Sequence, residues 1–180
     1  FGASRNRYIR FHWTGGLELS ILMLDRYLWT KDLDTLQQHL PVIQSILSAF
    51  MHRFPQNNMG VIDMFPSQSL ETWQCNSPAN RSDCVTNPTP DIAGLIAVLK
   101  RTIALPESVV SKAQREIWKN YLKALPEIPV ESVNGEAIIL PGTGLPPKPH
   151  NTENVELYTV HPYRLYGVST VSYTHLTLPT

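Results

Sequence analysis

Two consecutive segments of the chain carry apolar residues at helical spacing, but their patterns around the helix axis differ. The segment 16–29 is apolar on almost every face, which is typical of a helix buried in a larger assembly. The segment 36–54 has a single apolar stripe opposite polar residues, formed by Leu36, Leu40, Ile43, Leu47, Phe50 and Phe54. A buried helix followed by an amphipathic one predicts a two-layer helical hairpin, a pattern that other helical bundles share.

Prolines, of which the chain has 15, mark most of the other boundaries. Pro41 predicts a kink or a restart in the second helix, because proline is tolerated in a first turn but not in a helix interior. The run Thr89-Pro90-Asp91 predicts a third helix that continues to about residue 104. Pro106 is expected to start a fourth helix, with Val110, Ala113, Ile117, Tyr121 and Leu122 facing inward. The remaining expected elements are short strands at 59–65 and 137–140 and a short helix within 155–166.

The charge balance excludes several classes of partner. Lys and Arg together number 15, as do Asp and Glu, so the formal net charge is zero. A nucleic-acid surface needs clustered positive charge, and an anionic membrane surface would attract the same clusters. No apolar run approaches the roughly 18 residues of a membrane-spanning helix. We therefore expect neither a nucleic-acid partner nor a membrane partner. The sequence also lacks metal-ligand spacings and phosphate-binding loops, so we expect no metal and no cofactor.

A polar loop carries two signals of an oxidising compartment. Cys75 and Cys84 lie nine residues apart, and a disulfide between them would persist only outside the reducing cytosol. The run Asn80-Arg81-Ser82 in the same loop is an N-glycosylation sequon. Free thiols and a chance sequon are the alternatives. Together the two signals predict a secreted or extracellular protein with a Cys75–Cys84 disulfide and a glycan on Asn80.

Two polar clusters have the composition of a sugar site. A pyranose stacks its apolar face on an aromatic ring and offers a rim of hydroxyls to polar groups. In the first cluster, Trp13 and Glu18 flank a glycine pair that would let a ligand approach the backbone closely. Glu18 could instead complement only the helix dipole. The residues of the second cluster could instead be ordinary polar residues of a loop and a helix cap. Its candidate substrate-binding residues are Glu71, Trp73, Asn87 and Asp91.

The third cluster is the densest in amide and acid side chains. Its candidate substrate-binding residues are Asn151, Glu153, Asn154 and Glu156. Such side chains donate to and accept from sugar hydroxyls, although the same run could form a capping box at a short helix. Hydrolysis of a glycosidic bond needs two carboxyl groups across a cleft, one of them a proton donor with a raised pKa. The carboxyls that could form this pair are Glu71, Asp91, Glu136 and Glu153.

The runs 65–73, 87–95 and 151–166, taken in this order, resemble motifs of the six-hairpin glycosidase superfamily. The likeness covers most of residues 5–168. The branch of the superfamily that it indicates is similar to glycoside hydrolase family ninety-five, the fucosidase and galactosidase toroids. The resemblance implies an all-α fold, a partial (α/α)6 toroid with a short β-hairpin and long loop insertions. It also implies a sugar site at one end of the inner helices.

The family motifs place individual residues in this site. The stretch Pro-Ser-x-Ser-Pro-Glu-Asn of the family aligns with 66–72, which implies that Glu71 lies at the substrate. The general acid of the family lies near Gly-x-x-x-Glu-Trp, for which Glu136 is the nearest candidate, although the tryptophan is absent here. A histidine-rich substrate motif falls on 151–158, where Leu157 and Tyr158 match and the histidines are replaced.

These features together predict a fragment of a secreted glycoside hydrolase, with Glu136 and Glu71 as catalytic candidates and inversion as the expected stereochemistry. Residues 1–170 are expected to form part of the toroid, and residues 171–180 resemble a non-native read-through tail. An oligosaccharide or polysaccharide is the expected partner. One alternative is a non-catalytic carbohydrate-binding toroid. A lyase is another, with His161 or Tyr163 as a base.

Overall fold

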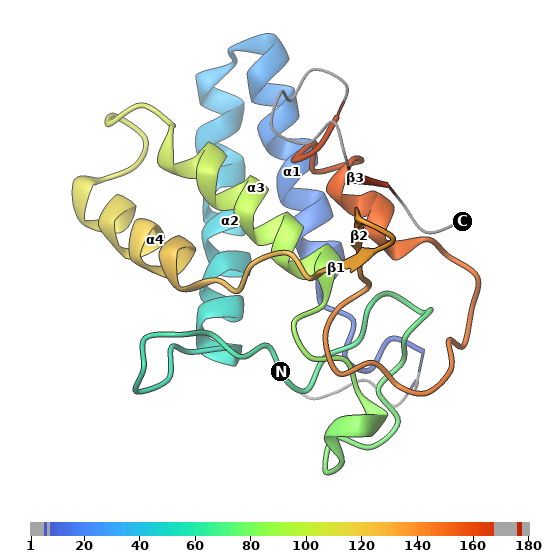
Figure 1. Ribbon diagram of the computed structural model, residues 1–180. Helices are drawn as coiled ribbons and strands as arrows, with labels where there is room; N and C mark the ends of the chain where they lie inside the picture. The colour runs from blue at the N-terminus through green and yellow to red at the C-terminus, as the bar shows by residue number, and fades with distance from the viewer. Residues whose placement is uncertain (1–5, 7, 168–175, 178–180) are drawn as a thin grey trace.

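The computed structural model describes residue 6, residues 8–167 and residues 176–177, and its architecture is mainly helical (Figure 1). The four α-helices are α1 (Thr14–Thr30), α2 (Leu33–Arg53), α3 (Thr89–Ile103) and α4 (Lys112–Ala124). Helix α1 packs against both α2 and α3, and α4 packs against α3. The chain therefore forms two successive helical hairpins whose first helices, α1 and α3, lie side by side. The expectation of a mainly helical fold is confirmed.

Helix α1 buries one face and exposes another. Leu17, Ile21 and Leu24, spaced three or four residues apart, are buried against the neighbouring helices. Leu22 and Trp29 on the other side are 64% and 80% exposed. Helix α1 therefore exposes one side in the described part of the chain, and its burial in a larger assembly stays a prediction. The helix with the most buried residues is α3.

Helix α2 runs unbroken through Pro41. The Asp32 side chain caps its first turn by accepting from the Thr35 N–H at 3.0 Å. Pro41 lies well inside the helix, and its ring is exposed. The expected restart at Pro41 is therefore wrong. Burial of the stripe from Leu36 to Phe50 on the opposite face offsets the hydrogen bond that a proline cannot donate.

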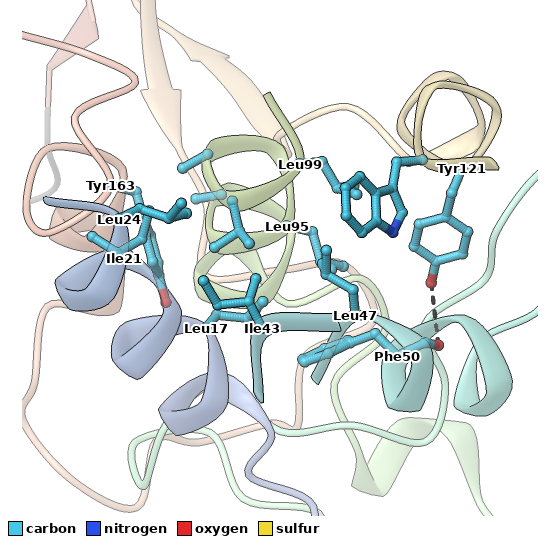
Figure 2. Packing of buried hydrophobic residues seen from close by; sticks show 14 of the residues in the cluster. Leu17, Ile21, Leu24, Ile43, Leu47, Phe50, Leu95, Leu99, Tyr121 and Tyr163 are labelled. Atoms are coloured by element: carbon cyan, nitrogen blue, oxygen red, sulfur yellow. Dashed lines mark hydrogen bonds between the residues drawn. The ribbon is translucent and has the colours of Figure 1, made fainter. Parts of the chain in front are cut away.

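Helix α3 begins where the sequence predicts, with Pro90 at the start and Asp91 in the first turn. Gly94 on this helix allows an unusually close approach. A Cβ atom at Gly94 would lie 2.8 Å from the Tyr163 hydroxyl and 2.8 Å from Leu17 Cδ1. Tyr163 therefore sits between α1 and α3 against bare backbone, as Figure 2 shows.

Helix α4 starts six residues later than expected. Val109 and Val110 donate backbone hydrogen bonds to Pro106, which closes a turn, and Ser111 then caps the helix through Gln114 N–H at 3.2 Å. The predicted inner face is also partly wrong, since Ile117 is 51% exposed while Trp118 is 1% exposed. Another inward residue, Tyr121, donates its hydroxyl to the carbonyl of Phe50 at 3.2 Å (Figure 2).

The sheet is small and lies outside the helical layers. Strands β1 (Val130–Val133) and β2 (Glu136–Ile139) form an antiparallel hairpin across Asn134 and Gly135. Both turn residues have positive φ, 53° and 86°, which is why an Asn-Gly pair is favoured there. The expected strand at 137–140 thus corresponds to β2. Strand β3 (Leu176–Thr177) pairs in parallel with β2. Most of the predicted read-through tail, residues 171–180, lies outside the described residues.

Within the segment 59–65, residues 59–60 form a turn and residues 61–65 are extended, but the segment is not a strand. Ile62 and Met64 are buried while Val61 and Asp63 are exposed, as period-2 alternation predicts. Its hydrogen bonds, however, go to helix and loop partners. Ile62 N–H donates to the Ala124 carbonyl at 3.1 Å, and Met64 N–H donates to the Asn87 side chain at 2.9 Å. The strand predicted here is wrong, because no adjacent strand pairs with it over its length.

The long loop between α2 and α3 is closed by the Cys75–Cys84 disulfide. The two sulfurs are buried together with Phe11, next to the short 3-10 helix η1 (Arg81–Asp83). The Gln68 side chain donates to the Tyr8 carbonyl at 2.7 Å and accepts from the Phe11 N–H at 3.0 Å. The loop thereby fixes the segment that leads into α1. A second 3-10 helix, η2 (Val155–Thr159), packs on α3.

Candidate functional site

Ionisable side chains from three distant segments meet near the N-terminal ends of α1 and α3. Glu18 comes from the second turn of α1 and Asp91 from the first turn of α3, while Tyr158 and Tyr163 come from η2 and the residues after it. The contacts of α3 with both α1 and η2 bring these segments together (Figure 1). Each of these side chains interacts electrostatically with at least one of the others.

Asp91 is the buried centre of this group, with none of its surface exposed. Its carboxyl accepts a hydrogen bond from the Thr14 hydroxyl at 2.5 Å and a longer one from the Ser67 hydroxyl at 3.4 Å. Burial raises the pKa of Asp91 to about 7, and the negative charge of Glu18 adds to this rise. The two hydrogen bonds act in the opposite direction and are outweighed. Asp91 therefore holds a proton through mildly acidic pH.

Glu18 and Tyr158 are the half-exposed members of this group. The Tyr158 hydroxyl and the Glu18 carboxyl interact electrostatically. Burial raises the pKa of Tyr158, and the charges of Glu18 and Glu153 raise it further. Tyr158 is thus a neutral hydrogen-bond donor next to two carboxylates.

Tyr163 is 1% exposed, and its hydroxyl has no hydrogen-bond partner among the described residues. Burial raises the pKa of Tyr163, and Asp91 and Glu18 raise it further. A phenol next to two carboxyls but bonded to neither is uncommon, because a buried polar atom without a partner is costly. This hydroxyl is a fixed polar group facing the carboxyls.

Glu153 joins the group from the loop before η2. Its carboxylate accepts from the Thr72 hydroxyl at 2.8 Å, and its backbone carbonyl is 3.4 Å from the same hydroxyl. Glu156 in η2 is 5% exposed, and burial raises the pKa of its carboxyl. Asn151 and Asn154 are exposed beside them. The third sequence cluster therefore supplies both an exposed and a buried acid.

The other predicted site residues occupy varied positions. Glu71 is half-buried in the loop after Leu70, and Glu136 is exposed at the start of β2. Trp73 is half-buried. The roles of these three residues stay predictions, because the geometry of the described residues does not test them.

Trp13 and Asn87 make contacts that favour a structural role for both residues. The Arg53 guanidinium lies 5.5 Å from the centre of the Trp13 ring, which also lines an open groove along α2. No acidic residue is among those that line this groove. Asn87 has a positive φ of 51°, and its side-chain oxygen accepts from Met64 N–H at 2.9 Å. This bond fixes the turn before α3.

Sequence reasoning did not identify the hydroxyl groups that hold the acids. Thr14, Ser67 and Thr72 each donate to a carboxylate of the site. Their partners are 77, 24 and 81 residues away in the sequence. The available signal was indirect, since Ser67 and Thr72 both fall in the run 65–73 that carries the family resemblance.

A comparison of the chain with protein-family models found no match, and neither did comparisons with curated proteins and with solved structures. Within the described residues, no helix is both long and apolar enough to cross a bilayer. In the same part of the chain, no three His, Cys, Asp or Glu side chains are grouped as metal ligands would be. The site is therefore characterised by its own geometry.

Proposed function

We propose that the chain is part of a glycoside hydrolase and that its two hairpins belong to an (α/α)6 toroid. A toroid of this type repeats helical hairpins so that their first helices line the inside and their second helices the outside. The side-by-side packing of α1 and α3, with α2 and α4 each paired to one of them, supports this arrangement. Six hairpins need twelve helices, so the four described here would form about a third of such a ring.

The observation that carries the proposal is that Glu18 interacts electrostatically with the buried Asp91, and that Glu18 and Glu153 both interact with Tyr158. Hydrolysis by acid and base requires carboxyls whose environments separate their pKa values. Burial keeps Asp91 protonated up to about pH 7, whereas Glu153 is exposed and bonded to Thr72. Asp91 is too buried to touch a substrate, so it acts as a positioning residue through Thr14 and Glu18.

Glu18 and Glu153 are then the carboxyls within reach of a sugar. The charges of both raise the pKa of Tyr158, which supports a position near this one phenol. One would protonate the leaving oxygen and the other would activate a water molecule. Glu136 and Glu71, the pair inferred from the family motifs, are the alternative candidates for the general acid and the general base.

The test is an assay of the longest gene product containing this chain against a panel of α- and β-glycosides. We expect Glu18→Gln and Glu153→Gln each to lower kcat by about 10²- to 10⁴-fold, the usual contribution of a general acid or base. Glu116→Gln is the matched control, because this acid on α4 is exposed and paired with Lys119. Loss of turnover only with Glu71→Gln or Glu136→Gln would transfer the catalytic roles to that pair. Sugar binding without turnover on any glycoside would favour the carbohydrate-binding alternative.

We also propose that the protein is secreted and carries a glycan on Asn80. The Cys75–Cys84 disulfide closes the loop that contains this residue, and Asn80 is exposed on it. The Ser82 hydroxyl donates to Asn80 Oδ1 at 2.9 Å, so both side chains of the sequon lie together at the surface.

Translation of the chain into microsomes tests the proposal of secretion. We expect a mass increase that an N-glycosidase removes, a loss of that increase in Asn80→Gln, and its retention in Ser82→Thr, which preserves the hydroxyl. Non-reducing electrophoresis should show the closed disulfide in the same samples. An unglycosylated product that retains free thiols inside microsomes would contradict the proposal.

A further inference from the structure

Glu153 lies in the connection between β2 and η2, in which residues 140–154 form neither a helix nor a strand (Figure 1). Residues 150–153 of this connection are all exposed. In the described part of the chain, their hydrogen bonds to other segments all go to Thr72, Gln74 and Asn76. The position of Glu153 therefore depends on residues 72–76, which are called the loop edge below.

Thr72 makes the direct contact with Glu153. Its hydroxyl donates to Glu153 Oε2 at 2.8 Å and lies 3.4 Å from the Glu153 carbonyl oxygen. The Thr72 carbonyl accepts from the His150 N–H at 2.6 Å. Thr72 is 3% exposed, and a buried β-branched side chain has little rotational freedom about χ1. Its hydroxyl is therefore a fixed donor for the Glu153 carboxylate.

The His150 ring makes a second contact with the loop edge. Its Nδ1 accepts from the Gln74 N–H at 3.4 Å, and its Nε2 lies 3.2 Å from the side-chain nitrogen of Asn76. Gln74 and Asn76 are the two neighbours of Cys75 in the sequence. The ring thus holds residues 150–153 against the part of the loop edge that contains the disulfide.

The loop edge is itself fixed on both sides. On one side, Ser69 and Trp73 exchange backbone hydrogen bonds of 3.0 and 3.1 Å. On the other side, Cys75 is bonded to Cys84, whose sulfur is buried with that of Cys75. A cross-link that closes a short loop removes most of the conformations open to the residues beside it. Opening the disulfide would therefore release the two residues that hold the His150 ring.

We infer that the Cys75–Cys84 disulfide holds Glu153 in place through Thr72 and His150, so that the site is complete only after the two thiols are oxidised. For catalysis the inference rests on the proposed function, in which Glu153 is one of the carboxyls that act on the sugar. Thr72 and His150 are positioning residues, because they act through Glu153.

The oxidation step balances with an external disulfide as the oxidant. The two cysteine thiols lose two protons and two electrons to form the S–S bond, and the external disulfide takes them up and becomes two thiols. Oxidants of this class act in secretory compartments and not in the reducing cytosol. Oxidation in the secretory route would therefore complete the site.

Backbone order parameters of residues 150–153, measured by NMR relaxation on the full chain, test the inference. We expect values near 0.85 in the parent chain and below about 0.6 in the double variant Cys75→Ser/Cys84→Ser. Thr72→Val, which keeps the shape of the side chain and removes the donor, should also lower them. Thr72→Ser, which keeps the hydroxyl, should restore them. The methyl signals of the helical core report whether each variant remains folded.

Thr143→Val is the matched control. It removes another threonine hydroxyl from the same connection, one that donates to the Thr86 carbonyl at 3.0 Å. The two backbone hydrogen bonds between Thr86 and Thr143 remain, so the order of residues 150–153 should not change. Unchanged order in both the cysteine double variant and Thr72→Val, or an equal loss of order in Thr143→Val, would overturn the inference.

Turnover separates this inference from the proposed function. On any glycoside that the longest gene product hydrolyses, Thr72→Val and the cysteine double variant should lower kcat by up to about 10²-fold, the effect of a displacement of about 1 Å at a reacting group. KM should change less, and Thr72→Ser should recover most of the kcat. Lost order with unchanged kcat would support the role of the disulfide and contradict the catalytic role of Glu153. Unchanged order would overturn the inference whatever the kcat.

Discussion

The free energy of unfolding should fall by about 4 kcal/mol as the pH rises from 4 to 8, because of Asp91. Burial raises the pKa of this carboxyl from 3.8 to about 7. Below pH 3.8 the group is protonated in both the folded and the unfolded chain, and it contributes no pH dependence. Between about pH 4 and 7 only the folded chain keeps the proton, so stability falls by about 1.4 kcal/mol per pH unit. Above pH 7 the buried carboxylate is ionised and the full penalty is present.

Urea unfolding followed across this pH range measures the effect. The Asp91→Asn variant should lose most of the slope, because an amide does not ionise and its oxygen can still accept from Thr14. Glu156 contributes in the same direction, since burial also raises the pKa of its carboxyl, and Glu156→Gln isolates that part. A slope that Asp91→Asn leaves unchanged, or stability that rises between pH 4 and 7, would contradict the burial of a proton at Asp91.

Truncation of Trp118 should lower the free energy of unfolding by about 3–5 kcal/mol, the range for replacing a buried aromatic residue by alanine. The Trp118 side chain is 1% exposed and belongs to the main core cluster, which joins α4 to α3. Its removal leaves a cavity that the rigid helices on either side cannot fill. Because α4 buries few other residues, among them Tyr121 and Ala124, we expect the helix to detach before the rest of the core unfolds.

Trp29→Ala is the matched control for this experiment, since it removes the same side chain from a position that is 80% exposed. Its effect should stay within about 0.5 kcal/mol, as for most surface substitutions. Circular dichroism is the appropriate probe, because both variants change the tryptophan fluorescence. Equal effects of the two substitutions would show that Trp118 is not a core residue of the folded chain.

The helices could be predicted from the sequence because their signals are local. The spacing of Leu36, Leu40 and Ile43 predicts the buried stripe of α2, and Pro90 with Asp91 predicts the start of α3. The errors arose where tertiary contacts outweighed local rules. Pro41 is retained inside α2 because the opposite face is buried.

The candidate site was predictable only as separate pieces. Glu18, Asp91 and Glu153 each stood out in the sequence, as an acid beside a glycine pair, an acid at a helix start and an acid among amides. Their meeting depends on the packing of α1 and η2 against α3, and Gly94 permits the close approach of Tyr163. No spacing in the sequence encodes that contact.

The sequence by itself determined the helical segments, the cysteine loop and the residue types of the site, because periodicity, capping and turn chemistry act over a few neighbouring residues. The tertiary structure decided which acid is buried, which is exposed and which hydroxyl each acid accepts from. The burial of a residue depends on all the groups that pack around it. The pKa of Asp91 therefore depends on Thr14 and Glu18, more than 70 residues away, as much as on its own helix.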